Sequence, residues 1–309
     1  MKHQIKIILL LLFMFLITQI IGLIVIDAYS PITAFNPTAN NATIPYGMEP
    51  PKVDANVSLL NIIVSLAIAV FIFFMLMKFK ARSLIKIWFT FVVFITISIA
   101  LTALLIKTFP EIGLRPDIIA PIIAAPLTFY KIFKRNIIIH NATELLIYPG
   151  LGCIFVPILN IWTIIILLVL ISIYDMWAVW KSKFMVNLAK FQIQKLKVFT
   201  GFFVPYLPKK EAEKLKLAQK IKTQKSKTQA LKKIKISLAI LGGGDVAFPL
   251  IFAGVVYRAA GLIPALIVIA GATIALGLLF IFSQKGKFYP AMPFITAGCL
   301  LSWLISLIV

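Results

Sequence analysis

Two aspartates stand inside long apolar stretches of this sequence, where charged side chains are rare. Asp175 lies in Ile171-Ser-Ile-Tyr-Asp-Met-Trp177, and Asp245 lies in Leu241-Gly-Gly-Gly-Asp-Val-Ala-Phe-Pro249. A carboxylate at membrane depth costs about 2.5–3.5 kcal/mol on insertion scales, so it marks a functional site by default. The other acidic residues are expected in connecting segments or at the edges of apolar runs: Asp27, Glu49, Asp54, Glu111, Asp117, Glu144, Glu211 and Glu213.

A pair of carboxylates in a poor dielectric is suited to acid–base chemistry. Two carboxylates within a few ångströms cannot both ionise cheaply, so the pair is expected to hold one proton between them and to titrate as a unit. Peptide hydrolysis needs that state, because the ionised member takes a proton from water while the protonated member hydrogen-bonds the scissile carbonyl. We therefore expect Asp175 and Asp245 to meet and to hydrolyse peptide bonds within the membrane. The sequence leaves open which aspartate plays which role.

The composition is that of an integral membrane protein. The 309 residues are 61% hydrophobic, against about 45–50% in an ordinary soluble domain. The net charge of +21 reflects membrane topology rather than nucleic-acid binding, because the basic residues fall in alternate connections between apolar runs. Cys153 and Cys299 have neither the number nor the spacing of a disulfide framework or a zinc site.

The fold class predicted is an all-α membrane protein with nine transmembrane helices, each of about 20 apolar residues. The first span could instead be a secretory signal, but its apolar stretch exceeds the core of about 7–15 residues that signals have. The predicted spans are Ile5–Ile26, Val57–Met77, Leu84–Ile106, Ile118–Phe133, Thr143–Leu159, Ile161–Val179, Ile236–Val256, Leu262–Phe282 and Phe288–Val309.

Basic residues set the orientation in the plasma membrane. With the amino terminus in the cytoplasm and the carboxyl terminus outside, nearly all lysines and arginines fall on the cytoplasmic side. The exceptions are Lys52, Lys107, Arg115 and Arg258. At about 1.5 Å per helical residue, Asp175 then lies about 9 Å from Lys181, and Asp245 lies about 15 Å from Lys235 if the helix is unbroken there. Both aspartates are thus expected in the cytoplasmic half of the membrane.

The chain is expected to have three parts. Residues 1–180 carry the first six spans and Asp175, residues 181–235 form a basic cytoplasmic connection, and residues 236–309 carry the last three spans and Asp245. Within the connection, Phe184–Leu196 has the pattern of a helix on the membrane surface. The apolar stretch Val198–Pro208 is too short to span and is expected to be interfacial or to occlude the site. The remainder is interpreted as a solvated tether near anionic headgroups.

Glycines and prolines surround the predicted site. Gly242 to Gly244 would let another backbone approach and would loosen the helix, as an extended scissile bond requires; alternatively, they form a helix-packing face. Pro249 removes a further helical hydrogen bond. In Phe288-Tyr-Pro-Ala-Met-Pro293, the prolines would free backbone groups that can pair with an extended substrate strand. The alternative is a simple kink at the start of the last span.

These motifs resemble those of the presenilin and signal peptide peptidase family of intramembrane aspartyl proteases, including archaeal homologues. The family's Tyr-Asp matches Tyr174-Asp175, its Gly-x-Gly-Asp matches Gly242-Gly-Gly-Asp245, and its Pro-Ala-Leu is approximated by Pro290-Ala-Met292. Gly243 replaces a bulkier apolar residue and Met292 replaces leucine. Pro293 follows as in presenilins.

The resemblance implies a presenilin-like helix bundle that cleaves transmembrane segments of membrane proteins within the lipid bilayer, without a cofactor or metal. The orientation matches presenilin, which implies substrates whose amino ends lie outside. The catalytic pair implied is Asp175 and Asp245. The substrate-binding residues implied are Tyr174, Gly242, Gly243, Gly244, Pro290, Ala291, Met292 and Pro293.

Two other functions fit the aspartates. A cation- or proton-coupled transporter could use them as coupling carboxylates on broken helices, although the sequence shows no duplicated half. An inactive relative could bind membrane helices as a scaffold. Zinc and serine proteases are not favoured, because there is no His-Glu-x-x-His and the histidines, His3 and His140, are expected outside the spans.

Overall fold

The computed structural model describes residues 5–29, 82–109, 115–134, 136–181, 200–206, 237–283 and 289–308, and isolated positions between 60 and 79. The described part is mostly helical, with one pair of strands. Its helices are α1 (Ile5–Tyr29), α3 (Arg82–Thr108), α4 (Pro116–Phe129), α5 (Ile137–Phe155), α6 (Ile161–Trp180), α10 (Gly243–Ala260), α11 (Leu262–Phe282) and α12 (Met292–Ser306). A π-helical turn (Tyr130–Lys134) extends α4, a 3-10 turn (Val156–Ile158) extends α5, and the strands are β1 (Gly201–Tyr206) and β2 (Ser237–Gly242).

Within this described part, seven helices are long and apolar enough to cross a membrane, and α12 is a shorter apolar helix. Eight of the nine predicted spans thus correspond to an observed helix, although several boundaries differ. The remaining one, Val57–Met77, lies mostly outside the described residues, so the count of nine stays a prediction. The predicted surface helix Phe184–Leu196 and the tether that ends at Lys235 also lie outside them.

Polar caps explain where two of the helices begin. Asn136 precedes α5, and its side-chain oxygen accepts hydrogen bonds from the backbone N–H groups of Ile138 and Ile139. Asn160 precedes α6 and accepts one from Thr163 in the same way. These side chains satisfy backbone donors that the first helical turn would otherwise leave unpaired. Each cap therefore fixes the residue at which its helix starts.

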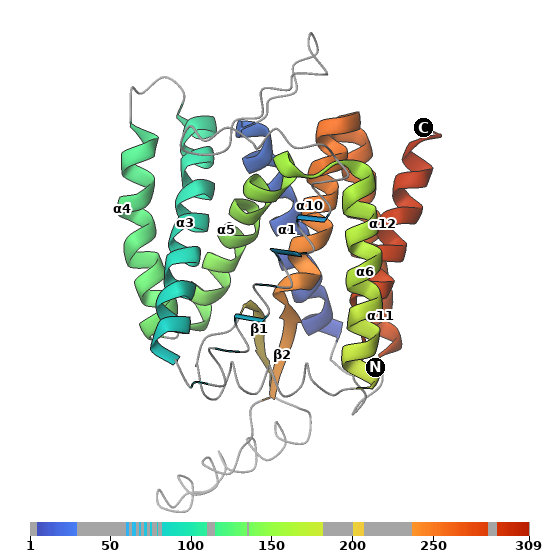
Figure 1. The fold of residues 1–309 in the computed structure, drawn as a ribbon, viewed down its shortest axis with the longest axis horizontal. Helices are drawn as coiled ribbons and strands as arrows, with labels where there is room; N and C mark the ends of the chain where they lie inside the picture. The colour runs from blue at the N-terminus through green and yellow to red at the C-terminus, as the bar shows by residue number, and fades with distance from the viewer. Residues whose placement is uncertain are drawn as a thin grey trace, which may run out of the picture.

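Helix α10 lies in the middle of the bundle (Figure 1). It packs against α1, α5, α6, α11 and α12, whereas α3 and α4 pack together at the side of α5. The largest fully buried side chains include Phe15 of α1 and Phe252 of α10. At one end of the bundle, Asp27 of α1 is bonded to Lys107 of α3 and to Tyr257 of α10. The helix that carries Asp245 is therefore packed against five neighbouring helices.

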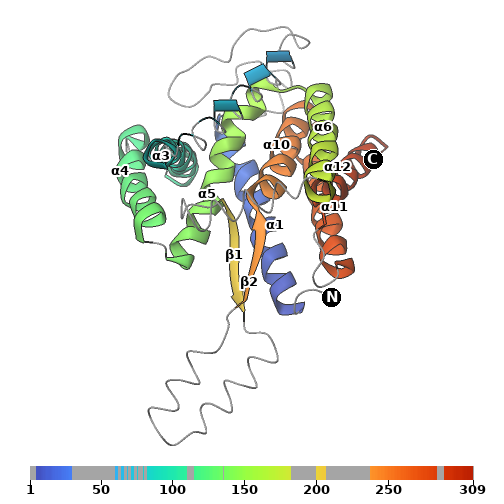
Figure 2. The same cartoon turned by 60° about the horizontal axis from the view of Figure 1, so that its bottom comes forward.

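The two strands pair antiparallel at the opposite end of the bundle (Figure 2). Their register runs from Gly201 opposite Gly242 to Tyr206 opposite Ser237. β2 therefore leads directly into the first turn of α10. The predicted interfacial stretch Val198–Pro208 supplies β1.

This strand corrects the predicted seventh span, Ile236–Val256, which was expected to be helical from its first residue. In β2, Ala239 and Leu241 are 1% and 2% exposed, whereas Leu238 and Ile240 are 41% and 40% exposed. That alternation has the period of two that a strand requires. The helix begins only at Gly243, so the depth estimated for Asp245 on an unbroken helix was wrong.

Candidate active site

Asp175 lies near the end of α6 and is 6% exposed. Its Oδ2 accepts a hydrogen bond of 3.1 Å from the backbone N–H of Met292, at the start of α12. One turn earlier in α6, Ser172 donates to the Thr296 hydroxyl of α12 at 2.8 Å. One face of α6 carries Asp175, and these two polar contacts hold that face against α12.

Asp245 lies in the first turn of α10 and is partly exposed. Gly242 before it is extended (φ −63°, ψ 145°), so the chain changes from strand to helix within three residues of the carboxylate. A Cβ on Gly242 would lie 3.1 Å from Oδ2 of Asp245, which is tighter than an ordinary contact. Glycine at this position therefore leaves room for the carboxylate to fold back toward the strand.

The structure brings the two aspartates together. Helices α6 and α10 pack against each other, and both pack against α12, so the two carboxylates lie on a shared group of three helices. A buried carboxylate held by a backbone N–H thus lies beside a partly exposed one at a break in a helix. Such a pair can share a proton, activate water and polarise a carbonyl.

Comparison with known proteins shows the family of the chain. Residues 12–309 match the family model described as signal-peptide peptidase, presenilin aspartyl protease. The chain belongs to this family. It is an intramembrane aspartyl protease.

Two solved structures support the fold of the protease. A presenilin family intramembrane aspartate protease solved in space group C222 is 19% identical, with a TM-score of 0.64 over 98% of this chain and 99% of that one. One solved in space group P2 is 18% identical, with a TM-score of 0.61 over 96% of each chain. No curated protein matches the sequence. Neither the family nor these structures favours a transporter.

The other glycines of the protease's motif have different surroundings. A Cβ on Gly243 would lie 2.9 Å from the Tyr148 hydroxyl oxygen and 3.2 Å from Cβ of Thr200. A Cβ on Gly244 would meet Phe248 at 3.6 Å, an ordinary contact, and Gly244 is exposed. Close packing therefore demands a glycine at 243, whereas at 244 it does not.

The remaining predicted site residues lie at the start of α12 and on α6. Pro290 and Met292 are buried, while Ala291 and Pro293 are partly buried at the beginning of the helix. The Tyr174 side chain is 47% exposed and packs against Trp177, with ring centroids 6.3 Å apart. Among the described residues, no hydrogen bond joins Tyr174 to either aspartate. Its side chain therefore lies on an exposed face of α6.

Gln19 is a site neighbour that the sequence analysis missed. It lies in α1, is fully buried, and donates a hydrogen bond of 3.0 Å to the backbone carbonyl of Val246, the residue after Asp245. Its side-chain oxygen has no partner among the described residues. A buried amide inside an apolar span was the available signal, because such groups are rarely placed there without a bonding role.

Two predictions about polar residues were wrong. Glu144 was expected at the edge of a span and His140 outside the spans, but both are buried within α5, and Glu144 is 0% exposed. The cap at Asn136 starts α5 at Ile137, earlier than the predicted Thr143. Among the described residues, no cluster of three or more His, Cys, Asp or Glu side chains could hold a metal ion.

Proposed function

We propose that Asp175 and Asp245 are the catalytic pair of this protease. The observation that carries the proposal is the meeting of α6, α10 and α12 around the two carboxylates, with the Met292 N–H bound to Asp175. The family membership supplies the reaction class, and these residues supply the groups that it needs.

The reaction divides between the two carboxyl groups. The ionised aspartate takes a proton from water, whose oxygen attacks the scissile carbonyl carbon, while the protonated aspartate donates a hydrogen bond to the carbonyl oxygen. The tetrahedral adduct then collapses as the C–N bond breaks, and a carboxyl proton goes to the leaving amine. The Met292 N–H holds one Asp175 oxygen in place, which keeps that carboxylate oriented toward the substrate.

The substrate is proposed to be a transmembrane segment of a membrane protein, bound in an extended form. β2 has one strand partner in the described part of the chain, so its outer edge offers backbone groups to an extended peptide. Gly242 and exposed Gly244 leave space for the peptide backbone, and Gly243 permits the packing of Tyr148. Pro290, Ala291, Met292 and Pro293 complete the site on the α12 side, with Tyr174 at its margin.

The proposed topology places nine spans in the plasma membrane, with the amino terminus in the cytoplasm and the carboxyl terminus outside. α1 begins at the end of the bundle that holds the strand pair, and α12 ends at the other (Figure 1). Lys6, Lys134 and Lys181 lie at the helix ends on the strand side, as positive residues favour the cytoplasmic face. The site then opens toward the cytoplasm, and the segments 1–180 and 236–309 each provide one aspartate.

Cleavage by the purified chain in detergent tests the catalytic pair. A single-span substrate is incubated with the wild-type protein, Asp175→Asn, Asp245→Asn and Asp117→Asn, and the products are mapped by mass spectrometry. Asp117 is the matched control, because it is exposed and pairs only with Arg115 in the described structure. We expect cleavage within the span by the wild-type and Asp117→Asn proteins and none by the other two. Cleavage by either of those two at the wild-type rate would refute the pair.

A further inference from the structure

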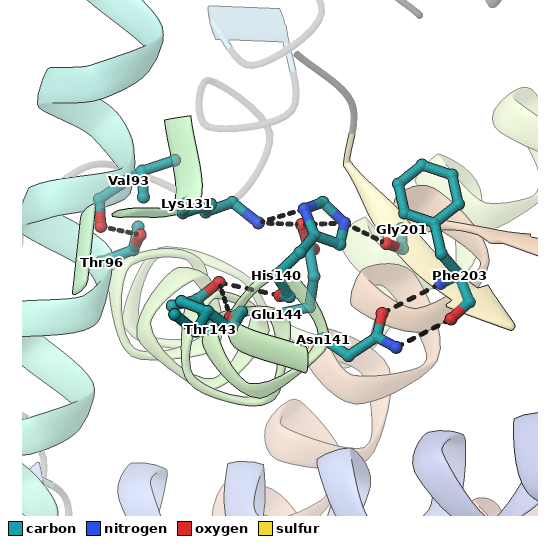
Figure 3. Close-up of polar contacts among 10 residues, drawn as sticks. Val93, Thr96, Lys131, His140, Asn141, Thr143, Glu144, Gly201 and Phe203 are labelled. Carbon is teal, nitrogen blue, oxygen red and sulfur yellow. Dashed lines mark hydrogen bonds and ion pairs between the residues drawn. The ribbon is translucent and has the colours of Figure 1, made fainter. Parts of the chain in front are cut away.

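A buried polar cluster lies at the start of α5, beside strand β1. Lys131, in the π-helical turn after α4, forms an ion pair with Glu144 of α5, and both side chains are almost fully buried. Lys131 Nζ also lies 3.3 Å from Nδ1 of His140 (Figure 3). Charges at this depth are costly to bury, and such groups are commonly retained for a specific structural or functional purpose.

The cluster is connected to strand β1. His140 Nε2 lies 2.8 Å from the carbonyl oxygen of Gly201, the first residue of the strand. A neutral ring with its proton on Nε2 satisfies both contacts, because Nε2–H donates to Gly201 while Nδ1 accepts from Lys131. The ring also packs on Phe203, with centroids 4.8 Å apart. Lys131, held by its ion pair with Glu144, thereby orients the histidine toward β1.

The side chain of Asn141, the next residue of α5, binds the backbone of the same strand. Its Nδ2 donates to the Phe203 carbonyl at 2.8 Å, and its Oδ1 accepts from the Phe203 N–H at 3.0 Å. One side-chain amide thus makes both hydrogen bonds that a neighbouring strand would make to that residue (Figure 3). His140 and Asn141 together form what we call the α5 clamp.

The clamped strand leads to the proposed catalytic residue. Gly201, bound by His140, is paired with Gly242, the last residue of β2, and the chain continues from there into the first turn of α10, which carries Asp245. Thr200, just before β1, packs against Gly243. A shift of β1 would therefore move Gly242 and Gly243, and with them the first turn of α10.

We propose that His140 and Asn141 are positioning residues, which hold Asp245 in its catalytic geometry by clamping β1. The inference rests on the proposed function of Asp245. An isolated pair of strands is only marginally stable, and its register is weakly specified where glycine replaces larger side chains. The α5 clamp gives β1 hydrogen bonds to a helix, in addition to its pairing with β2.

Asn141→Leu tests the clamp, because leucine has a similar size and makes neither hydrogen bond. Thr143→Val is the matched control on the same helix, since the Thr143 hydroxyl donates to carbonyls of α5 itself. We expect Asn141→Leu to lower kcat at least tenfold while KM changes less than threefold, at a temperature well below its unfolding midpoint. Thr143→Val should keep wild-type kcat and KM.

A disulfide across the strands distinguishes positioning from general stability. Val204 and Ala239 lie directly opposite each other, so cysteines at both sites are within reach of a bond. Adding Val204→Cys and Ala239→Cys to Asn141→Leu should restore at least a third of wild-type kcat when oxidised. A reductant should abolish the recovery. Cys153 and Cys299 are buried in helices α5 and α12, and neither lies in the strands.

Each result decides between the alternatives. Three results would overturn this inference and leave the proposed function standing. They are a wild-type kcat in Asn141→Leu, a loss of kcat that appears only where the variant has begun to unfold, and a loss of kcat that the oxidised cysteine pair does not repair. A wild-type protein that cleaves nothing would instead overturn the proposed function and this inference with it. Cleavage by wild type combined with a repairable loss of kcat supports both.

Discussion

The backbone N–H of Met292 and the carboxylate of Asp175 are joined by a hydrogen bond of 3.1 Å, although the residues are 117 positions apart in the sequence. Met292 is the first residue of α12, where backbone N–H groups have no partner within the helix. Pro293 follows it and has no N–H at all. The start of α12 therefore offers a backbone donor to the carboxylate, independently of the methionine side chain.

Replacing the Met292 amide by an ester should slow catalysis. An α-hydroxy acid at this position keeps the side chain and removes only the N–H. A hydrogen bond to a charged group contributes about 1.5–3 kcal/mol, so kcat is expected to fall by about ten- to hundredfold. Met292→Leu, which keeps the N–H, should stay within about threefold of wild type, because a volume-conserving exchange is well tolerated. Equal rates for the ester and amide proteins would exclude a role for this hydrogen bond.

The fit between Gly243 and Tyr148 predicts a compensating pair of substitutions. Gly243→Ala should lower the unfolding temperature and kcat, because the new methyl group would lie 2.9 Å from the Tyr148 hydroxyl. Tyr148→Phe removes that oxygen, which has no hydrogen-bond partner in the described structure. The double variant should therefore recover much of the stability lost by Gly243→Ala, as thermal unfolding in detergent can show. Additive losses would mean that Tyr148 does not limit the space at Gly243.

Gln19 is expected to steady the turn that carries Asp245. Gln19→Leu removes the hydrogen bond to Val246, a loss of about 0.5–1.5 kcal/mol, and should lower kcat severalfold. Thr18→Val is its control, because Thr18 is equally buried but donates to Met14 of its own helix. Cleavage rates and unfolding temperatures of the two variants are compared. Identical rates would remove Gln19 from the positioning of Asp245.

Apolar length and caps made most of the helices predictable. The predicted span Ile161–Val179 starts at the same residue as α6 because the cap residue Asn160 directly precedes an unbroken apolar run. The run before Gly243 was misread, because a strand and a helix of similar hydrophobicity were joined without a break. Its strand character depends on β1, a partner distant in sequence, which no local pattern reveals.

The proposed catalytic residues stood out for a physical reason that their neighbours lacked. A carboxylate in an apolar run is conspicuous, so Asp175 and Asp245 could be selected from the sequence. Asn141 is an ordinary polar residue until the fold brings it to Phe203, and Gln19 is conspicuous only as an amide in an apolar run, with no sign that its partner is Val246. Their roles arise from tertiary hydrogen bonds, whose partners cannot be identified from spacing.

The buried ion pair of Lys131 and Glu144 predicts strong dependence of each residue on the other. Lys131→Met would leave Glu144 charged and unpaired in the protein interior, at a cost of about 3–5 kcal/mol. Its unfolding midpoint should fall sharply, and Glu144→Leu alone should also destabilise the protein by leaving the lysine unpaired. In the double variant both charges are gone, so its stability should exceed that of either single variant. A cycle of the four proteins, unfolded in detergent, measures the coupling.

The exposed pair Arg115 and Asp117, taken through the same cycle, should show little coupling, because solvent screens surface ion pairs. Comparable coupling in the two cycles would contradict the burial argument, whereas strong coupling at Lys131 and Glu144 alone would support it.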